Sequence, residues 1–94
     1  MTGLVYVYDG NDVVIYEAKK GNADIQSLYQ LLMYWDGAVS DGINPSEGIL
    51  IATKFSPGID EVMKLMNNMT DQNGNNYNFI KKTWKDEGVD FPKE

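Results

Sequence analysis

Residues 48–53 (GILIAT) are apolar almost throughout, and this short run constrains the fold more than any other stretch of the chain. Such a run is typical of a strand in a parallel sheet that is buried on both faces. Residues 24–42 before it have apolar side chains at helical spacing. A strand, a long helix and a buried strand make a right-handed crossover. Residues 13–19 and 49–53 are therefore expected to be parallel neighbours in a mixed sheet.

The N-terminal part of the chain predicts a hairpin. Residues 4–8 (LVYVY) and 12–19 (DVVIYEAK) are rich in β-forming side chains, and the turn between them contains Gly10 and Asn11. Residues pair across such a turn so that Asp9 faces Asp12 and Leu4 faces Glu17. This register decides which side chains of the two strands can meet.

The C-terminal part predicts a second helix and a last strand. Ser56 and Pro57 supply an N-cap and a first-turn proline, and the helix stripe is Ile59, Val62, Met63, Met66 and Met69. Residues 77–84 are expected to form the strand. The order is then β-β-α-β-α-β, an α/β fold with a mixed sheet. We expect one domain over residues 1–94, with its core at 4–53, the helix and strand at 57–85 and a charged tail at 86–94.

The charged residues exclude several classes of function. There are fourteen acidic residues and eight lysines in 94 residues, with no arginine, histidine or cysteine, and the net charge is −6. The chain thus lacks the commonest general base and the bidentate donor that reads guanine. A net negative charge argues against coating nucleic acid by bulk electrostatics. No stretch reaches the roughly 18 apolar residues of a membrane span, so a cytoplasmic protein is expected.

Charged residues stand at the end of the second predicted strand, in Glu17-Ala18-Lys19. Side chains alternate along a strand, so Glu17 and Lys19 share one face. A carboxylate there can hold a hard divalent cation such as Mg²⁺, and an ammonium beside it can position water against a phosphate. The alternative is an ordinary exposed Glu and Lys at the end of a strand.

The helix predicted after this tripeptide carries Gln30-Leu31-Leu32-Met33-Tyr34, and this context favours a functional interpretation of the tripeptide. An (D/E)xK strand end followed by a helical QxxxY motif resembles the PD-(D/E)XK nuclease superfamily, and most of all its RecB-type members. The resemblance covers residues 4–53. It implies a restriction endonuclease-like fold with Glu17 as a ligand of Mg²⁺ or Mn²⁺ and Glu17 and Lys19 as catalytic residues. Lys20, Gln30 and Tyr34 would then lie close to a DNA substrate.

One part of that pattern is missing from this sequence. The family carries a metal-binding aspartate on the preceding strand, and the matching place before Leu4-Val5 is Gly3. Asp9 and Asp12 are expected at the hairpin tip, about five residues from Glu17, or about 16 Å at 3.3 Å per residue. The family core also begins with a helix and a strand that this chain lacks. The chain could be a degenerate copy that keeps the fold, or it could be one part of a larger active protein. Alternatively, a partner subunit could complete the site.

Two hypotheses follow for the function. The first is a metal-dependent phosphodiesterase domain that acts on DNA. The second is a non-catalytic module of the same fold that serves oligomerisation or docking to a partner. Both predict self-association, as a dimer, or a partner chain or domain, because the sheet edge and an apolar helix face need cover.

A cluster near residue 71 imitates another kind of site. Asp71, Asn73 and Asn75 stand at the spacing of the first ligands of a calcium loop. The sixth position is Asn76 and the twelfth is Lys82, where glycine and glutamate are required. We therefore expect a polar turn.

Overall fold

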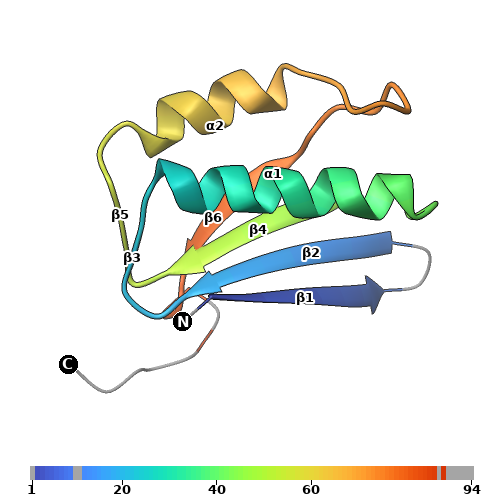
Figure 1. Cartoon of the computed structure of the whole chain (residues 1–94). Helices are drawn as coiled ribbons and strands as arrows, with labels where there is room; N and C mark the ends of the chain where they lie inside the picture. Colours follow the sequence, from blue (N-terminus) through green and yellow to red (C-terminus); the bar gives the residue numbers. More distant parts are fainter. Residues whose placement is uncertain (1, 10–11, 87, 89–94) are drawn as a thin grey trace.

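The computed structural model of the chain describes residues 2–9, 12–86 and 88 (Figure 1). The long strands are β1 (Thr2–Asp9), β2 (Asp12–Lys19), β4 (Glu47–Ala52) and β6 (Phe79–Thr83), and the helices are α1 (Ile25–Ser40) and α2 (Ile59–Asn67). Two strands of two residues each, β3 (Asn22–Ala23) and β5 (Lys54–Phe55), pair with one another beside the main sheet. The sequence did not predict this small second sheet. No helix in the described part of the chain is long and apolar enough to cross a membrane.

The main sheet has the strand order β1-β2-β4-β6. β1 and β2 are antiparallel, in the register that pairs Asp9 with Asp12 and Leu4 with Glu17. β2 pairs in parallel with β4, and β4 with β6. The mixed α/β sheet, the hairpin register and the parallel neighbours expected from the sequence are thus confirmed.

Both helices cover the same face of this sheet (Figure 1). α1 packs against β2 and β4, and α2 packs against α1 and β6. α1 begins with a capping box, in which the Asp24 carboxylate accepts the backbone N–H of Ser27 at 3.0 Å. Its buried stripe contributes to one hydrophobic core with β2, β4 and α2: Leu28, Leu31, Trp35, Ala38 and Val39.

The start and the end of α2 differ from the sequence-based expectation. The N-cap is Gly58, in the left-handed region at φ 86°, and Ser56 lies two residues upstream of it. Only glycine adopts this conformation at little cost, so the turn through Pro57 and Gly58 delays the helix. The helix ends at Asn67, which leaves Met69 beyond it and exposed, whereas Met63 and Met66 are buried. The prediction that Met69 belongs to the core stripe is therefore wrong.

The polar segment after α2 folds around Asp71, as a turn and not as a calcium loop. One oxygen of Asp71 accepts the backbone N–H groups of Asn73 and Asn75, at 2.9 and 3.0 Å. The other accepts the indole N–H of Trp35 at 3.0 Å. Trp35 in turn packs on Tyr77 and Phe79, with ring centroids 5.4 to 5.5 Å apart. This cluster fastens the loop to α1 and the start of β6.

Candidate functional site

Glu17 is the only ionisable side chain of β2 that is fully buried among the described residues, with 0% of its surface exposed. It shares the helix-covered face of the strand with Val13 and Ile15, which are also buried. A carboxylate loses several kcal/mol of hydration on burial and must recover it from a cation, from hydrogen-bond donors or by holding a proton. A buried acid on a strand face built from aliphatic side chains is therefore a candidate functional group.

Lys19 lies two residues further on, half-buried at the end of β2. Strand geometry puts its Cα about 7 Å from that of Glu17, on the same face. The pKa of Asp24, which precedes α1, lies below its usual value because the backbone and hydroxyl of Ser27 hydrogen bond to it, with a smaller contribution from the charge of Lys19. The Lys19 ammonium is thus close enough to the start of α1 to act on groups there.

Two distant residues hold the backbone that carries the lysines. The indole N–H of Trp84 donates to the carbonyl of Lys19 at 2.8 Å. The hydroxyl of Thr53 donates to the carbonyl of Lys20 at 2.6 Å. Sequence analysis missed both residues, because they lie 65 and 33 positions from their partners and no local pattern marks them.

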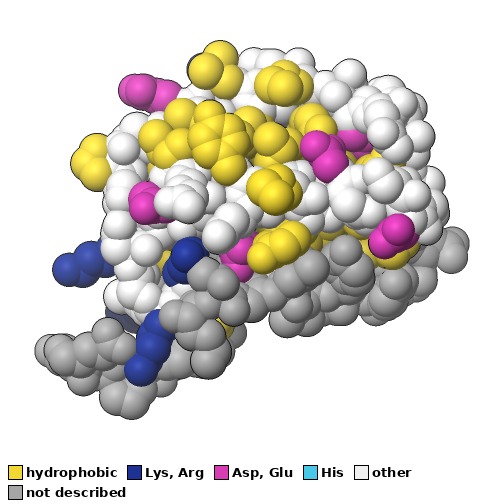
Figure 2. Space-filling model, viewed as in Figure 1, with side chains coloured by type: hydrophobic (Ala, Val, Ile, Leu, Met, Phe, Trp, Pro, Cys, Tyr) yellow, Lys and Arg dark blue, Asp and Glu magenta, His cyan; other side chains and the backbone are white. Residues whose placement is uncertain are grey.

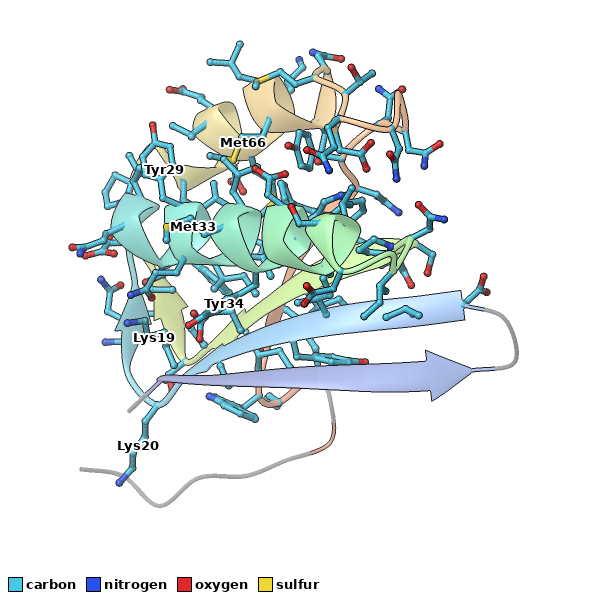
Figure 3. The ribbon with its side chains drawn as sticks, turned by 45° about the vertical axis from the view of Figure 1, so that its right-hand side comes forward. Lys19, Lys20, Tyr29, Met33, Tyr34 and Met66 are labelled. Atoms are coloured by element: carbon cyan, nitrogen blue, oxygen red, sulfur yellow. The ribbon has the colours of Figure 1, made fainter. Side chains whose placement is uncertain are left out.

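The helix residues of the motif are placed over this strand end. Tyr34 is half-buried and projects from the side of α1 that faces β2, above Lys19 (Figure 3). Gln30 lies one turn earlier, so the two side chains are neighbours on the helix surface. The Gln30 Oε1 atom is buried and accepts no hydrogen bond from the described residues.

Lys20 does not join this group. It is exposed, and its side chain points away from Lys19 and Tyr34 (Figure 3). The alternation of side chains along an extended chain accounts for the difference between the two adjacent lysines. Figure 3 thus shows Tyr34 above Lys19 at the end of β2, and Lys20 pointing away from both. Glu17 precedes Lys19 on β2, and Gln30 precedes Tyr34 on α1.

The acids of the described chain do not form a metal cluster. No group of three or more acidic residues that could hold a metal ion occurs within residues 2–9, 12–86 and 88. The β1 residues opposite Glu17 and Lys19 are Leu4 and Thr2, and neither carries a carboxylate. Asp9 and Asp12 pair with each other at the other end of the hairpin. Glu17 is thus the single carboxylate that the sheet offers at this place.

Comparison with known proteins gives one structural likeness and no match by sequence. No family model and no curated protein matches the chain. A solved structure of EndoMS in its apo form superposes with a TM-score of 0.59 and 18% sequence identity. The likeness covers 86% of this chain and 33% of the EndoMS chain, so this chain spans a third of that protein. At this identity the likeness concerns the fold alone. The chain shares its α/β fold with this part of EndoMS.

Proposed function

We propose that this chain is a PD-(D/E)XK-type nuclease domain that supports metal-dependent hydrolysis of DNA phosphodiesters at the end of β2. The observation that carries the proposal is the full burial of Glu17 two residues before Lys19 on β2, with Tyr34 of α1 above Lys19 (Figure 3). Glu17 and Lys19 belong to a strand, and Gln30 and Tyr34 to the helix after it, as the resemblance leads us to expect. The shared fold with EndoMS supports the same assignment.

The residues fit a magnesium ion with one protein carboxylate. Mg²⁺ in phosphate-processing sites is often held by one or two carboxylates, with waters and substrate phosphates filling the other positions. Glu17 would be that carboxylate, and a second acid would have to come from outside the described residues. A bound ion would polarise the phosphate and lower the pKa of a water. Lys19 would orient that water or stabilise the charge that develops on the phosphate.

The helix residues would bind and orient the substrate. Gln30 offers a buried oxygen that can accept a hydrogen bond, and its amide N–H₂ can donate one. Tyr34 offers a hydroxyl donor and an apolar ring to a sugar or base. Both roles need the substrate to lie between α1 and the end of β2. Lys20, which points away, would meet only a longer stretch of the DNA backbone.

A second candidate function is a non-catalytic module of the same fold. One observation favours it specifically, namely that the described residues supply a single carboxylate at the site. A domain of this kind would keep the sheet and α1 and use its surface to bind another protein. Glu17 would then be a retained but unused residue.

Cleavage assays with paired variants separate the two candidates. Labelled single- and double-stranded DNA are incubated with Mg²⁺, Mn²⁺ or EDTA, using the chain, Glu17→Gln and Lys19→Met. Glu47→Gln and Lys64→Met are matched controls, because Glu47 pairs with Val14 near the start of β2 and Lys64 is exposed on α2. We expect metal-dependent cleavage that both site variants lose by about 100-fold or more, and that both controls retain.

The same proteins are titrated with Mn²⁺ by calorimetry. Weakened binding in Glu17→Gln alone would assign the ion to this carboxylate. Cleavage that survives in Glu17→Gln would overturn the assignment, and the absence of both cleavage and metal binding would favour the non-catalytic module.

A further inference from the structure

An exposed apolar patch covers the outer surface of the two helices. Among residues 12–86, four large hydrophobic side chains are exposed, and all four lie there, on α1, on α2 or just after α2: Tyr29, Met33, Leu65 and Met69. Figure 2 shows hydrophobic side chains gathered over this side of the molecule. A small protein rarely leaves such a group uncovered unless something binds it.

The α1 part of the patch is a single row. Tyr29, Met33 and Gly37 are spaced by four residues, so they follow one another along the helix surface. Figure 3 places Tyr29 and Met33 on the outer side of α1, away from β2. Met33 is 68% exposed, and it stands at the centre of the row.

No contact within the described part of the chain requires a glycine at position 37. It is exposed and helical, and a methyl group added to it would meet no atom of the described residues within 4 Å. Glycine within a helix is less favourable than alanine because it loses more backbone entropy on folding. A bare position on a helix surface does, however, allow a side chain from another molecule to approach the backbone closely.

The charges on this surface suit a second copy of the same chain. α1 contains one charged residue in sixteen, Asp36, whose carboxylate accepts the hydroxyl hydrogen of Tyr77 at 2.5 Å. The chain as a whole has a net charge of −6, so most contacts between two copies would bring acidic residues together. An uncharged helix row is where two such molecules can meet without that repulsion.

We propose that two copies of the chain pack their α1 helices against each other, antiparallel, about a two-fold axis near Met33. In that arrangement the two Met33 side chains meet at the axis. Residues 29 and 37 are equally far from residue 33, so Tyr29 of each copy lies over Gly37 of the other. The large ring fills the space that the glycine leaves open, and the contact occurs twice by symmetry.

The dimer is expected to be weak. A helix of sixteen residues is about 24 Å long and about 10 Å wide, a footprint well below the roughly 800 Å² that each partner buries in a standard stable interface. Association should therefore depend on protein concentration over the micromolar to millimolar range. The surface is separate from Glu17 and Lys19, so the proposal stands or falls independently of nuclease activity.

Sedimentation velocity from about 10 µM to 1 mM tests the proposal. We expect a monomer–dimer equilibrium that Met33→Lys abolishes. Leu65→Lys is the matched control, because Leu65 on α2 is 67% exposed and the same charge is added. It should leave the equilibrium within about twofold. A chain that stays monomeric at 1 mM, or a dimer lost in Leu65→Lys and kept in Met33→Lys, would overturn the proposal.

Gly37→Ala gives a second test with effects of opposite sign. Alanine favours the helix, so the thermal midpoint of the dilute monomer should rise by roughly 4 °C. The added methyl group should obstruct Tyr29 of the other copy and weaken dimerisation about tenfold or more. A variant that is more stable and dimerises as well as the parent chain would show that Gly37 does not lie in an interface.

Discussion

Two carboxylates are buried among the side chains that the structure describes, Glu17 and Asp71, and their settings differ. Asp71 sits in a turn, and three donors surround it, from Trp35, Asn73 and Asn75. These contacts explain its burial as a means of fastening a loop. Glu17 lies within β2, two residues before the strand ends at Lys19, where it neither closes a turn nor caps a helix. The comparison shows that burial alone does not identify a site, and that a local structural role must first be excluded.

The largest loss of stability is expected when the Asp71 carboxylate is removed. Asp71→Ala leaves the indole N–H of Trp35 and two backbone N–H groups without their acceptor. We expect the free energy of unfolding to fall by about 3 kcal/mol, because all three lost bonds have a charged acceptor and the Trp35 donor is buried. Urea unfolding followed by Trp fluorescence measures it. A loss below about 1 kcal/mol would show that Asp71 is not an anchor.

A somewhat smaller effect is expected at Gly48, under the aromatic cluster that Asp71 holds in place. A Cβ at this position would lie 2.7 Å from Cδ1 of Phe79, which is too close for carbon atoms. Gly48→Ala should therefore cost about 1 to 3 kcal/mol as Phe79 shifts against Trp35 and Tyr77. Gly21→Ala, where an added Cβ meets no described atom within 4 Å, is the control for urea unfolding. Equal free energies of unfolding for the two variants would mean that the Phe79 ring can shift at little cost.

The pH dependence of the free energy of unfolding tests whether the ionised Asp71 carboxylate stabilises the fold. Burial acts to raise its pKa, but the hydrogen bonds from Trp35, Asn75 and Asn73 outweigh this and lower the pKa below its usual value. The ionised form is therefore favoured by folding, so this stability is present above about pH 4 and is lost as pH falls through the folded pKa.

Asp71→Asn should flatten the decline in the free energy of unfolding between about pH 4 and pH 2, measured by urea unfolding at each pH. The decline should not vanish, because Asp24 and Asp86 also have lowered pKa values and remain in the variant. An identical decline in both proteins would contradict the assignment to Asp71.

The smallest effect on stability is expected at Glu17. Gln has nearly the same shape and carries no charge, so Glu17→Gln removes the cost of desolvating a carboxylate. We expect the free energy of unfolding to change by no more than about 1 kcal/mol, because Gln keeps the shape of the side chain and can still accept a hydrogen bond. A loss as large as that of Asp71→Ala would show that both acids are structural, and would count against a site at the end of β2.

Local rules predicted the parts of the fold that depend on neighbouring residues. The register of Asp9 with Asp12 follows from turn chemistry, and the placement of Glu17 on the same face as Ile15 follows from alternation, whereas its full burial was not predicted. The start of α2 was missed because Ser56 and Pro57 carry the usual signals of a helix N-terminus, whereas the left-handed turn at Gly58 sets the real one. The presence of a glycine shows that a left-handed turn is possible at that position, but it does not show that the chain adopts one there.

The candidate site was predictable only in part, for a related reason. Gln30 and Tyr34 were found because one helix presents both side chains with a fixed spacing. The supports of the strand end, Thr53 and Trp84, belong to other elements, and only the folded sheet brings them to Lys20 and Lys19. The missing second acid was evident from the sequence, and the described structure supplies no substitute.

The hydrogen bond from Trp84 to Lys19 also concerns the order in which the molecule forms. Contacts between residues far apart in sequence close slowly, because the loop between them must first lose its entropy. During synthesis the β1–β2 hairpin can fold early, but Lys19 has to wait until the residues after β6 have left the ribosome. The strand end that carries the candidate chemistry would thus be among the last parts of the chain to be fixed. A nascent chain would form its β1–β2 hairpin before the end of β2 is fixed.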